Sequence, residues 1–181
     1  SMSVSESFSM HPLLAERTAG VLLHPTSLPA THGAVGIGDL GPTARQFAEW
    51  VAEAGLQRWQ VLPIGPVGDG DSPYSARSSF AIEPMLVSVA DLAEDGYLPD
   101  TAVRCGSVEE KADGRGRASW RRARKWKTPR LEAAFQKFCT RRGKLGKHGR
   151  DYLDFESRQA AWLQAWCQYA ADQAQRVHAG T

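Results

Sequence analysis

The chain has 181 residues, of which 42 % are hydrophobic and 23 % are charged, and its formal net charge is +2. This length suits one globular domain, but it is too short for a complete eight-stranded β/α barrel, which takes at least about 200 residues. The sequence holds no apolar run of roughly 18 residues that could span a membrane, and its polar N-terminus lacks the apolar core of a signal peptide.

The first third of the chain has the pattern of a strand, a helix and a second strand. Residues 1–16 show no sustained periodicity, so we expect them to form a flexible arm. A short apolar strand is predicted at 21–23, and a second strand at 58–64. Between them, a helix is expected to begin at Pro42 and to be closed by Gly55.

This order of elements predicts a βαβ unit, in which the crossover makes the two strands parallel. The loops that begin at His24 and Gly65 must then emerge on the same face, where barrels and open α/β sheets build their sites. His24 therefore has two interpretations. It either contacts a substrate or serves as a structural donor between a buried strand and a turn.

The loop from Gly65 to Tyr74 combines three glycines and two prolines with two carboxylates. Asp69 and Asp71 invite comparison with the paired carboxylates of retaining glycoside chemistry, which lie about 5 to 5.5 Å apart. Such pairs usually come from the ends of different strands, so we do not assign a catalytic pair here. Calcium binding is not favoured either, because calcium needs six to eight oxygen ligands and this loop offers only two carboxylates.

The end of this loop holds the better candidates for binding. A tyrosine ring can cover the apolar face of a sugar while its phenol and a nearby serine bond the hydroxyls, which makes Ser72 and Tyr74 candidates. The alternative for Tyr74 is a packing role that locks the loop. Asp71 either caps a local turn by accepting backbone N–H bonds or holds sugar hydroxyls.

The second half of the chain is predicted to be mainly helical. A basic linker is expected at 143–149, and the pattern dissolves around 105–116. The predicted elements are a strand at 85–89, a short helix at 91–95, a helix capped by Thr128 that begins at Pro129 and ends before Gly143, and a long helix at 152–177.

Charge is unevenly distributed. Residues 104–150 carry sixteen Lys and Arg against four acidic residues, whereas the rest of the chain carries six basic and sixteen acidic residues. The run from Arg115 to Arg130 holds eight positive charges, two tryptophans and no acid, as a nucleic-acid surface would. It would equally suit a helix laid against an acidic neighbour, and because the rest of the chain is acidic we favour this structural interpretation.

The three cysteines, Cys105, Cys139 and Cys167, have no paired spacing. Their positions indicate neither a disulfide framework nor a zinc site. A reducing, cytoplasmic location is the expectation that fits them best.

Two long motifs resemble the amylomaltases, the 4-α-glucanotransferases of glycoside hydrolase family 77. One is the block Gly20-Val-Leu-Leu-His-Pro-Thr-Ser-Leu-Pro29 followed by Gly36-Ile-Gly-Asp-Leu-Gly41, and the other is Trp59-Gln-Val-Leu-Pro63 followed by Gly70-Asp-Ser-Pro-Tyr74. The likeness extends over about 17–99 and weakens at 131–172. Asp69 stands where amylomaltases often carry a tyrosine of a second glucan site, and Glu83 stands where the family commonly has asparagine.

The resemblance implies an α/β fold, the beginning of a (β/α)8 TIM barrel with an inserted, mainly helical subdomain. On this basis we expect residues 17–100 to form the first βα units with substrate-groove loops, and 101–181 to form the basic linker and helical insertion. It implies substrate contacts by Asp71, Ser72 and Tyr74, with His24 as a further candidate. The family's catalytic carboxylates lie further along than this chain extends, so no catalytic residue is assigned.

The implied function is that of the N-terminal portion of a 4-α-glucanotransferase of starch and glycogen metabolism, which transfers α-1,4-glucan segments by a retaining mechanism and is inactive in this form. Its partners would be α-1,4-glucans and maltooligosaccharides, without a metal or cofactor, and with self-association or docking to the remainder of the barrel. The alternatives are a non-catalytic, truncated glucan-binding paralogue and a basic nucleic-acid-binding module.

Overall fold

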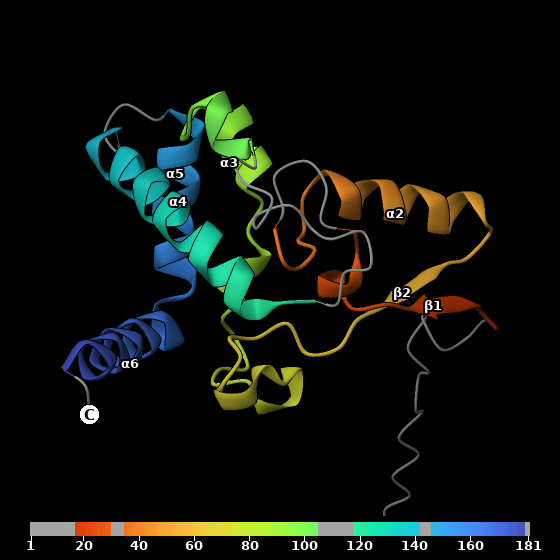
Figure 1. Ribbon diagram of the computed structural model, residues 1–181, viewed down its shortest axis with the longest axis horizontal. Helices are drawn as coiled ribbons and strands as arrows, with labels where there is room; N and C mark the ends of the chain where they lie inside the picture. The colour runs from red at the N-terminus through yellow and green to blue at the C-terminus, as the bar shows by residue number, and fades with distance from the viewer. Residues whose placement is uncertain (1–16, 30–34, 105–117, 142–145, 180–181) are drawn as a thin grey trace, which may run out of the picture.

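The computed structural model describes residues 17–29, 35–104, 118–141 and 146–179 (Figure 1). Strand β1 (Gly20–Leu22) pairs in parallel with β2 (Arg58–Gln60), and helix α2 (Pro42–Glu53) connects them. The register places Gly20 opposite Arg58. The predicted βαβ unit is therefore confirmed, although β2 is shorter than the predicted strand and no third strand joins the sheet within the described ranges.

Helix α2 has the boundaries that its sequence signals indicate. Pro42 occupies the first turn, where a missing N–H costs no helical hydrogen bond, and Gly55 follows the helix with a φ of +73°. Phe47 on this helix packs edge-on against Trp59 of β2, with ring centroids 4.9 Å apart. The indole N–H of Trp59 donates to the Leu23 carbonyl at 2.7 Å, which ties both strands to the helix.

The predicted strand at 85–89 is wrong, because local side chains cap helical turns there. The Ser88 hydroxyl accepts from the Asp91 N–H at 3.1 Å and so begins α3 (Val89–Glu94), close to the predicted short helix. Glu83 similarly accepts from the Met85 N–H at the start of a 3₁₀ turn. The 3₁₀ turns are η1 (Pro25–Ser27), η2 (Asp69–Asp71), η3 (Pro73–Ser75), η4 (Pro84–Leu86) and η5 (Asp100–Val103).

Helix α4 (Trp120–Arg141) begins nine residues before the predicted start, so Pro129 lies inside it. An interior proline removes one helical hydrogen bond and crowds the preceding turn. Buried residues on both sides of Pro129 hold the helix through this point, since Trp126 is 3 % exposed and Ala134 is 4 % exposed. Tertiary packing thus outweighs the local stop signal.

The predicted helix at 152–177 is observed as two helices, α5 (Lys147–Arg158) and α6 (Ala160–Ala179). The break falls at Gln159, whose side-chain oxygen accepts from the Trp162 indole N–H at 2.6 Å. The Trp162 ring stacks on Phe80 with a centroid distance of 5.6 Å, which holds α6 against the loop that follows β2. In the predicted basic linker, Gly146 forms a turn and the part that begins at Lys147 is helical, whereas 143–145 lie outside the described residues.

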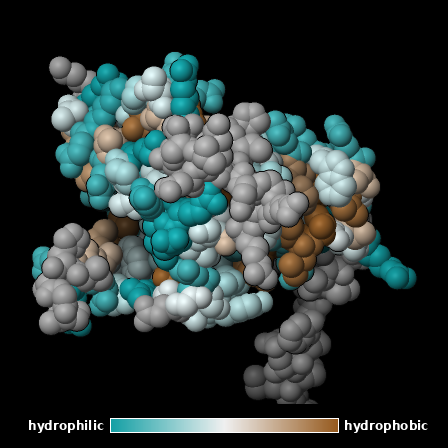
Figure 2. Space-filling view, in the orientation of Figure 1, coloured by the Kyte–Doolittle hydropathy of each residue, from teal (hydrophilic) through white to brown (hydrophobic). Residues whose placement is uncertain are grey.

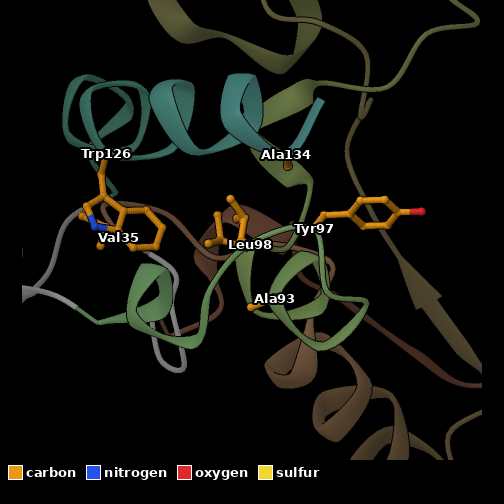
Figure 3. Close-up of a cluster of buried hydrophobic side chains, with 7 residues drawn as sticks. Val35, Ala93, Tyr97, Leu98, Trp126 and Ala134 are labelled. Carbon is orange, nitrogen blue, oxygen red and sulfur yellow. The ribbon is translucent and has the colours of Figure 1, made fainter. Parts of the chain in front are cut away.

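The main hydrophobic core lies between α3, α4 and the loop after β1. Figure 3 shows Trp126 and Ala134 of α4 facing Ala93, Tyr97 and Leu98, with Val35 beside the Trp126 ring. A second cluster comprises Ile37, Met85 and Ala123. The β1–α2 loop therefore contributes to both clusters and joins the sheet side of the molecule to the helical side (Figure 1).

A buried lysine occupies the centre of this junction. Lys127 of α4 has no exposed surface, and its ammonium donates to Asp39 Oδ2 at 2.7 Å, the Met85 carbonyl at 2.7 Å and the Val87 carbonyl at 2.8 Å. Asp39 is also buried, and its second oxygen accepts from the Gly41 N–H. Burial lowers the pKa of Lys127, and the charge of Asp39 opposes that shift.

The arm predicted at 1–16 and the segment predicted without pattern at 105–116 lie outside the described residues. The helices of the described ranges include none that is both long and apolar enough to cross a membrane. Hydrophobic side chains remain at the surface beside α2 and the strands (Figure 2), among them Leu22 of β1 at 55 % exposure and Trp50 of α2 at 53 %.

We expect Gly36→Ala to destabilise the chain more than Gly55→Ala, by thermal or urea unfolding. Both glycines have positive φ, near +79° and +73°, so both alanines carry a strain of about 1–2 kcal/mol. At Gly36 a Cβ would also meet the backbone at the start of α4, 2.4 Å from the Ser119 oxygen, whereas at Gly55 nothing lies within 4 Å. Equal losses in the two variants would contradict this account.

We expect Lys127→Met to lower the free energy of unfolding by about 3–5 kcal/mol, because it leaves the Asp39 carboxylate buried without its cation. Arg45→Met is the matched control, since it breaks the exposed Arg45–Asp91 pair and should cost less than about 1 kcal/mol. Urea denaturation followed by circular dichroism measures both. An unchanged midpoint for Lys127→Met would disprove the central role of this ammonium.

Candidate functional site

The loop that follows β2 folds back on itself as a compact unit. Val67 forms an antiparallel bridge with Ala76. The Gly68 N–H donates to the Ser75 carbonyl at 3.0 Å, and the Arg77 N–H donates to the Pro66 carbonyl at 2.8 Å. These bonds close a tight excursion whose tip contains η2 and η3, the segment with the predicted binding residues.

A buried glutamate fixes the base of this loop. Glu83 is 7 % exposed, and its carboxylate accepts from the Val67 N–H at 2.9 Å and the Met85 N–H at 3.1 Å. Its own N–H donates to the Ile64 carbonyl at 2.9 Å. In the sequence, Glu83 stands out only as a departure from the family's usual asparagine, whereas the structure shows that it joins the two ends of the loop.

Asp71 is held by a cation from a distant part of the chain. Asp71 has a φ of +57°, and the preceding Gly70 has a φ of +84°. Two successive residues at the tip of the loop therefore have left-handed backbone conformations. The Oδ1 of Asp71 accepts from Arg124 Nη2 at 2.6 Å. The capping alternative is not observed, because no backbone N–H of the described residues donates to this carboxylate.

Arg124 brings the first turns of α4 to the loop tip. Its guanidinium also lies over the Trp120 ring, 5.3 Å from the centroid. Further along the basic run, Lys127 is buried and Arg130 donates to the Ala102 and Trp126 carbonyls. These internal contacts support the structural interpretation of the run. The contact between Arg124 and Asp71 itself could not be predicted from either segment alone.

The hydroxyl-bearing residues of the loop face outward to different degrees. Tyr74 is 75 % exposed, so its ring does not lock the loop by packing and is free to meet a ligand. Ser72 is half-buried, and its carbonyl accepts from the Ser75 N–H at 3.1 Å. Asp71, Ser72 and Tyr74 thus present a carboxylate, a hydroxyl and an aromatic phenol within four consecutive residues.

His24 lies at the end of β1, where it precedes η1. Its carbonyl accepts from the Ser27 N–H, and its side chain is half-buried. Burial lowers the pKa of the imidazole, so the neutral form is favoured. Its Nδ1 is buried without a hydrogen-bond partner among the described residues. Within the described part of the chain, no hydrogen bond or ion pair connects the His24 side chain to the loop tip.

The described residues include no group of three His, Cys, Asp or Glu side chains placed to hold a metal ion. Cys139 and Cys167 are exposed and unpaired. The chemistry that the loop tip can perform is recognition of a polar ligand with an apolar face, through one fixed carboxylate, one hydroxyl and one exposed ring.

Comparison with known proteins identifies relatives across most of the chain. The family model described as 4-alpha-glucanotransferase matches residues 23–180. The 4-alpha-glucanotransferase of Thermus thermophilus is 40 % identical over 156 residues, which are 86 % of this chain and 28 % of that protein. The enzyme of the same name from Synechocystis is 36 % identical and covers 88 % of this chain and 30 % of its own length.

A solved structure shares the fold. The amylomaltase from Streptococcus agalactiae, in complex with acarbose, superposes with a TM-score of 0.70 at 25 % identity, over 88 % of this chain and 30 % of that chain. The sequence thus spans less than a third of the length of each of these relatives. Because the family model and the relatives cover nearly all of the sequence, the chain belongs to the 4-alpha-glucanotransferase family.

Proposed function

We propose that this chain is the N-terminal part of a 4-α-glucanotransferase and that its loop tip forms one wall of the glucan groove. The observation that carries the proposal is the exposed Tyr74 ring, which stands beside Ser72 and an anchored Asp71 in a member of this family. The parallel strands β1 and β2 would be the first two of a (β/α)8 barrel, with α4, α5 and α6 in its helical insertion.

The proposed contacts follow from the chemistry of pyranose sugars. One face of a glucose residue is apolar and its rim carries hydroxyls, so the Tyr74 ring would cover the face. Ser72 and Asp71 would bond the rim, with the carboxylate accepting from sugar hydroxyls. Arg124 already neutralises Asp71 in part, which suits a neutral ligand better than a cationic one.

The reaction of the whole protein would be transfer of an α-1,4-glucan segment with retention. A carboxylate nucleophile forms a covalent glycosyl-enzyme, and a second carboxylic acid protonates the leaving oxygen and then activates the acceptor hydroxyl. We assign neither role to this chain, because such carboxylate pairs usually come from the ends of different strands, where each carboxylate has its own environment.

The rest of the protein is the proposed partner of the exposed apolar surface beside α2 and the strands, shown in Figure 2. Leu22, Trp50 and Val61 are each more than a third exposed there. A two-stranded parallel sheet also leaves both of its edges without neighbours in the described ranges. We propose docking with the remaining barrel units, or self-association in their absence, in a cytoplasmic enzyme of starch or glycogen metabolism.

Tyr74→Ala should weaken maltotetraose binding by the 181-residue chain about tenfold, a loss of about 1.4 kcal/mol, because the ring that covers the sugar face is removed. Titration followed by nuclear magnetic resonance measures the affinity. Tyr74→Phe should keep most of the binding. Tyr169→Ala, on a ring of α6 that is 40 % exposed, is the control and should leave it unchanged. Unaltered affinity in Tyr74→Ala would exclude this residue from the site.

The purified chain should release no glucose from maltotriose, because the residues assigned here bind sugar but neither attack nor protonate it. Glucose release is measured by a coupled assay, with the full-length Thermus thermophilus relative as the positive control. Glucose release in proportion to the concentration of the 181-residue chain would overturn the assignment and would place catalytic carboxylates within this sequence.

A further inference from the structure

A cavity of about 420 Å³ lies between α3, α4 and α5, and the loop-tip site does not use it. Its apolar side includes Phe135 and Phe138 of α4, and its polar side includes Asp95 after α3, Tyr97, and His148 and Asp151 of α5. The volume falls within the range of about 300–1,000 Å³ that small-molecule sites occupy. Apolar walls with a few convergent polar groups are the usual composition of such sites.

The aromatic side of the cavity is open to a ligand. Phe135 of α4 lines the cavity and is 58 % exposed. Phe138 makes ring contacts with Tyr97, at 6.1 Å between centroids, and with Tyr152, at 5.2 Å. The cavity therefore has one supported ring and one exposed ring on its apolar side.

The polar side offers both a donor and acceptors. The Tyr97 hydroxyl lies 2.8 Å from His148 Nδ1. Burial raises the pKa of Tyr97, which keeps the phenol protonated, and when it donates to Nδ1 the imidazole carries its hydrogen on Nε2. Asp95 and Asp151 supply carboxylate oxygens, and the described residues that line the cavity include no Lys or Arg.

This composition discriminates between classes of ligand. Phosphates and other anions would meet two carboxylates and no cation among the described residues that line the cavity. An amine could bond the carboxylates, but it only donates and would leave the imidazole N–H without an acceptor. Hydroxyl groups both donate and accept, so a neutral polyhydroxylated ring matches the acceptors, the donor and the exposed aromatic face together.

The cavity is separate from the loop tip. Arg124, which contacts Asp71, and Phe135 are eleven residues apart on α4, which corresponds to about 16 Å along the helix axis at about 1.5 Å per residue. Helix α4 thus contacts the loop tip near its N-terminal end and forms part of the cavity wall near its C-terminal end.

We propose that this cavity is a second, non-catalytic binding site for the end of an α-1,4-glucan chain, with Phe135 as the ring that covers the sugar and Asp151 as an acceptor of its hydroxyls. The inference rests on the proposed function, since it takes the same class of ligand. A glucan held at both sites would be retained longer than at either site alone, because the second contact becomes intramolecular.

The test is a titration of the ¹⁵N-labelled 181-residue chain with maltotetraose, in which backbone signals of the cavity and of the loop tip are followed separately. Phe135→Ala and Asp151→Asn should each weaken the response of the cavity signals at least fivefold and leave those of the loop tip unchanged. Tyr74→Ala should do the reverse. Leu153→Ala, on an exposed α5 residue outside the cavity, is the control and should change neither.

The outcomes separate the two proposals. Shifts at the loop tip alone would overturn the cavity site and leave the proposed function standing, whereas shifts at the cavity alone would do the opposite. Phenethylamine is titrated in parallel, and a cavity response to the amine without a response to maltotetraose would overturn the sugar assignment. Because Asp151 is exposed, Asp151→Asn keeps the test valid if Phe135→Ala unfolds the chain.

Discussion

One buried ammonium holds the two sides of this structure together. Lys127 donates to a carboxylate of the β1–α2 loop and to two carbonyls of the segment before α3, so three segments meet at a single nitrogen. Burying a lysine is costly unless every donor finds a partner, and here all three hydrogens have one. Because those partners have fixed directions, the ammonium sets the position of α4 along its axis, which apolar contacts alone would leave less defined.

The loop-tip site depends on this placement of α4. Arg124 lies three residues before Lys127, about one helical turn, so the depth at which Lys127 is anchored decides whether the guanidinium reaches Asp71. Glu83 acts from the other direction, because it ties the base of the loop to the segment whose carbonyls Lys127 binds. The exposed Tyr74 ring thus stands on a loop fixed at its tip by one charged residue and at its base by another.

The sequence predicts well those features whose causes are local. Pro42 and Gly55 delimit α2 because their backbone preferences act within a single turn, and the apolar runs on either side identify the parallel strands. The prediction at Pro129 failed because the burial of Trp126 and Ala134 decides the helix, and burial depends on distant residues. In the site, the motif around Ser72 and Tyr74 can be recognised from the sequence alone. The roles of Arg124 and Glu83 become visible only in the folded structure, because their partners lie 53 and 16 residues away along the chain.

The separation of Lys127 from Asp39, 88 residues, also sets an order of events during synthesis. At about 5–20 residues per second, a ribosome needs about 4 to 18 seconds to add that length. Synthesis of the βαβ unit is complete at Gln60, so during the later part of this interval the unit is present while Asp39 still lacks its cation and the first cluster of apolar side chains lacks α4. The buried pair therefore cannot form, and Asp39 cannot be enclosed beside its cation, until the helix that carries Lys127 has been synthesised.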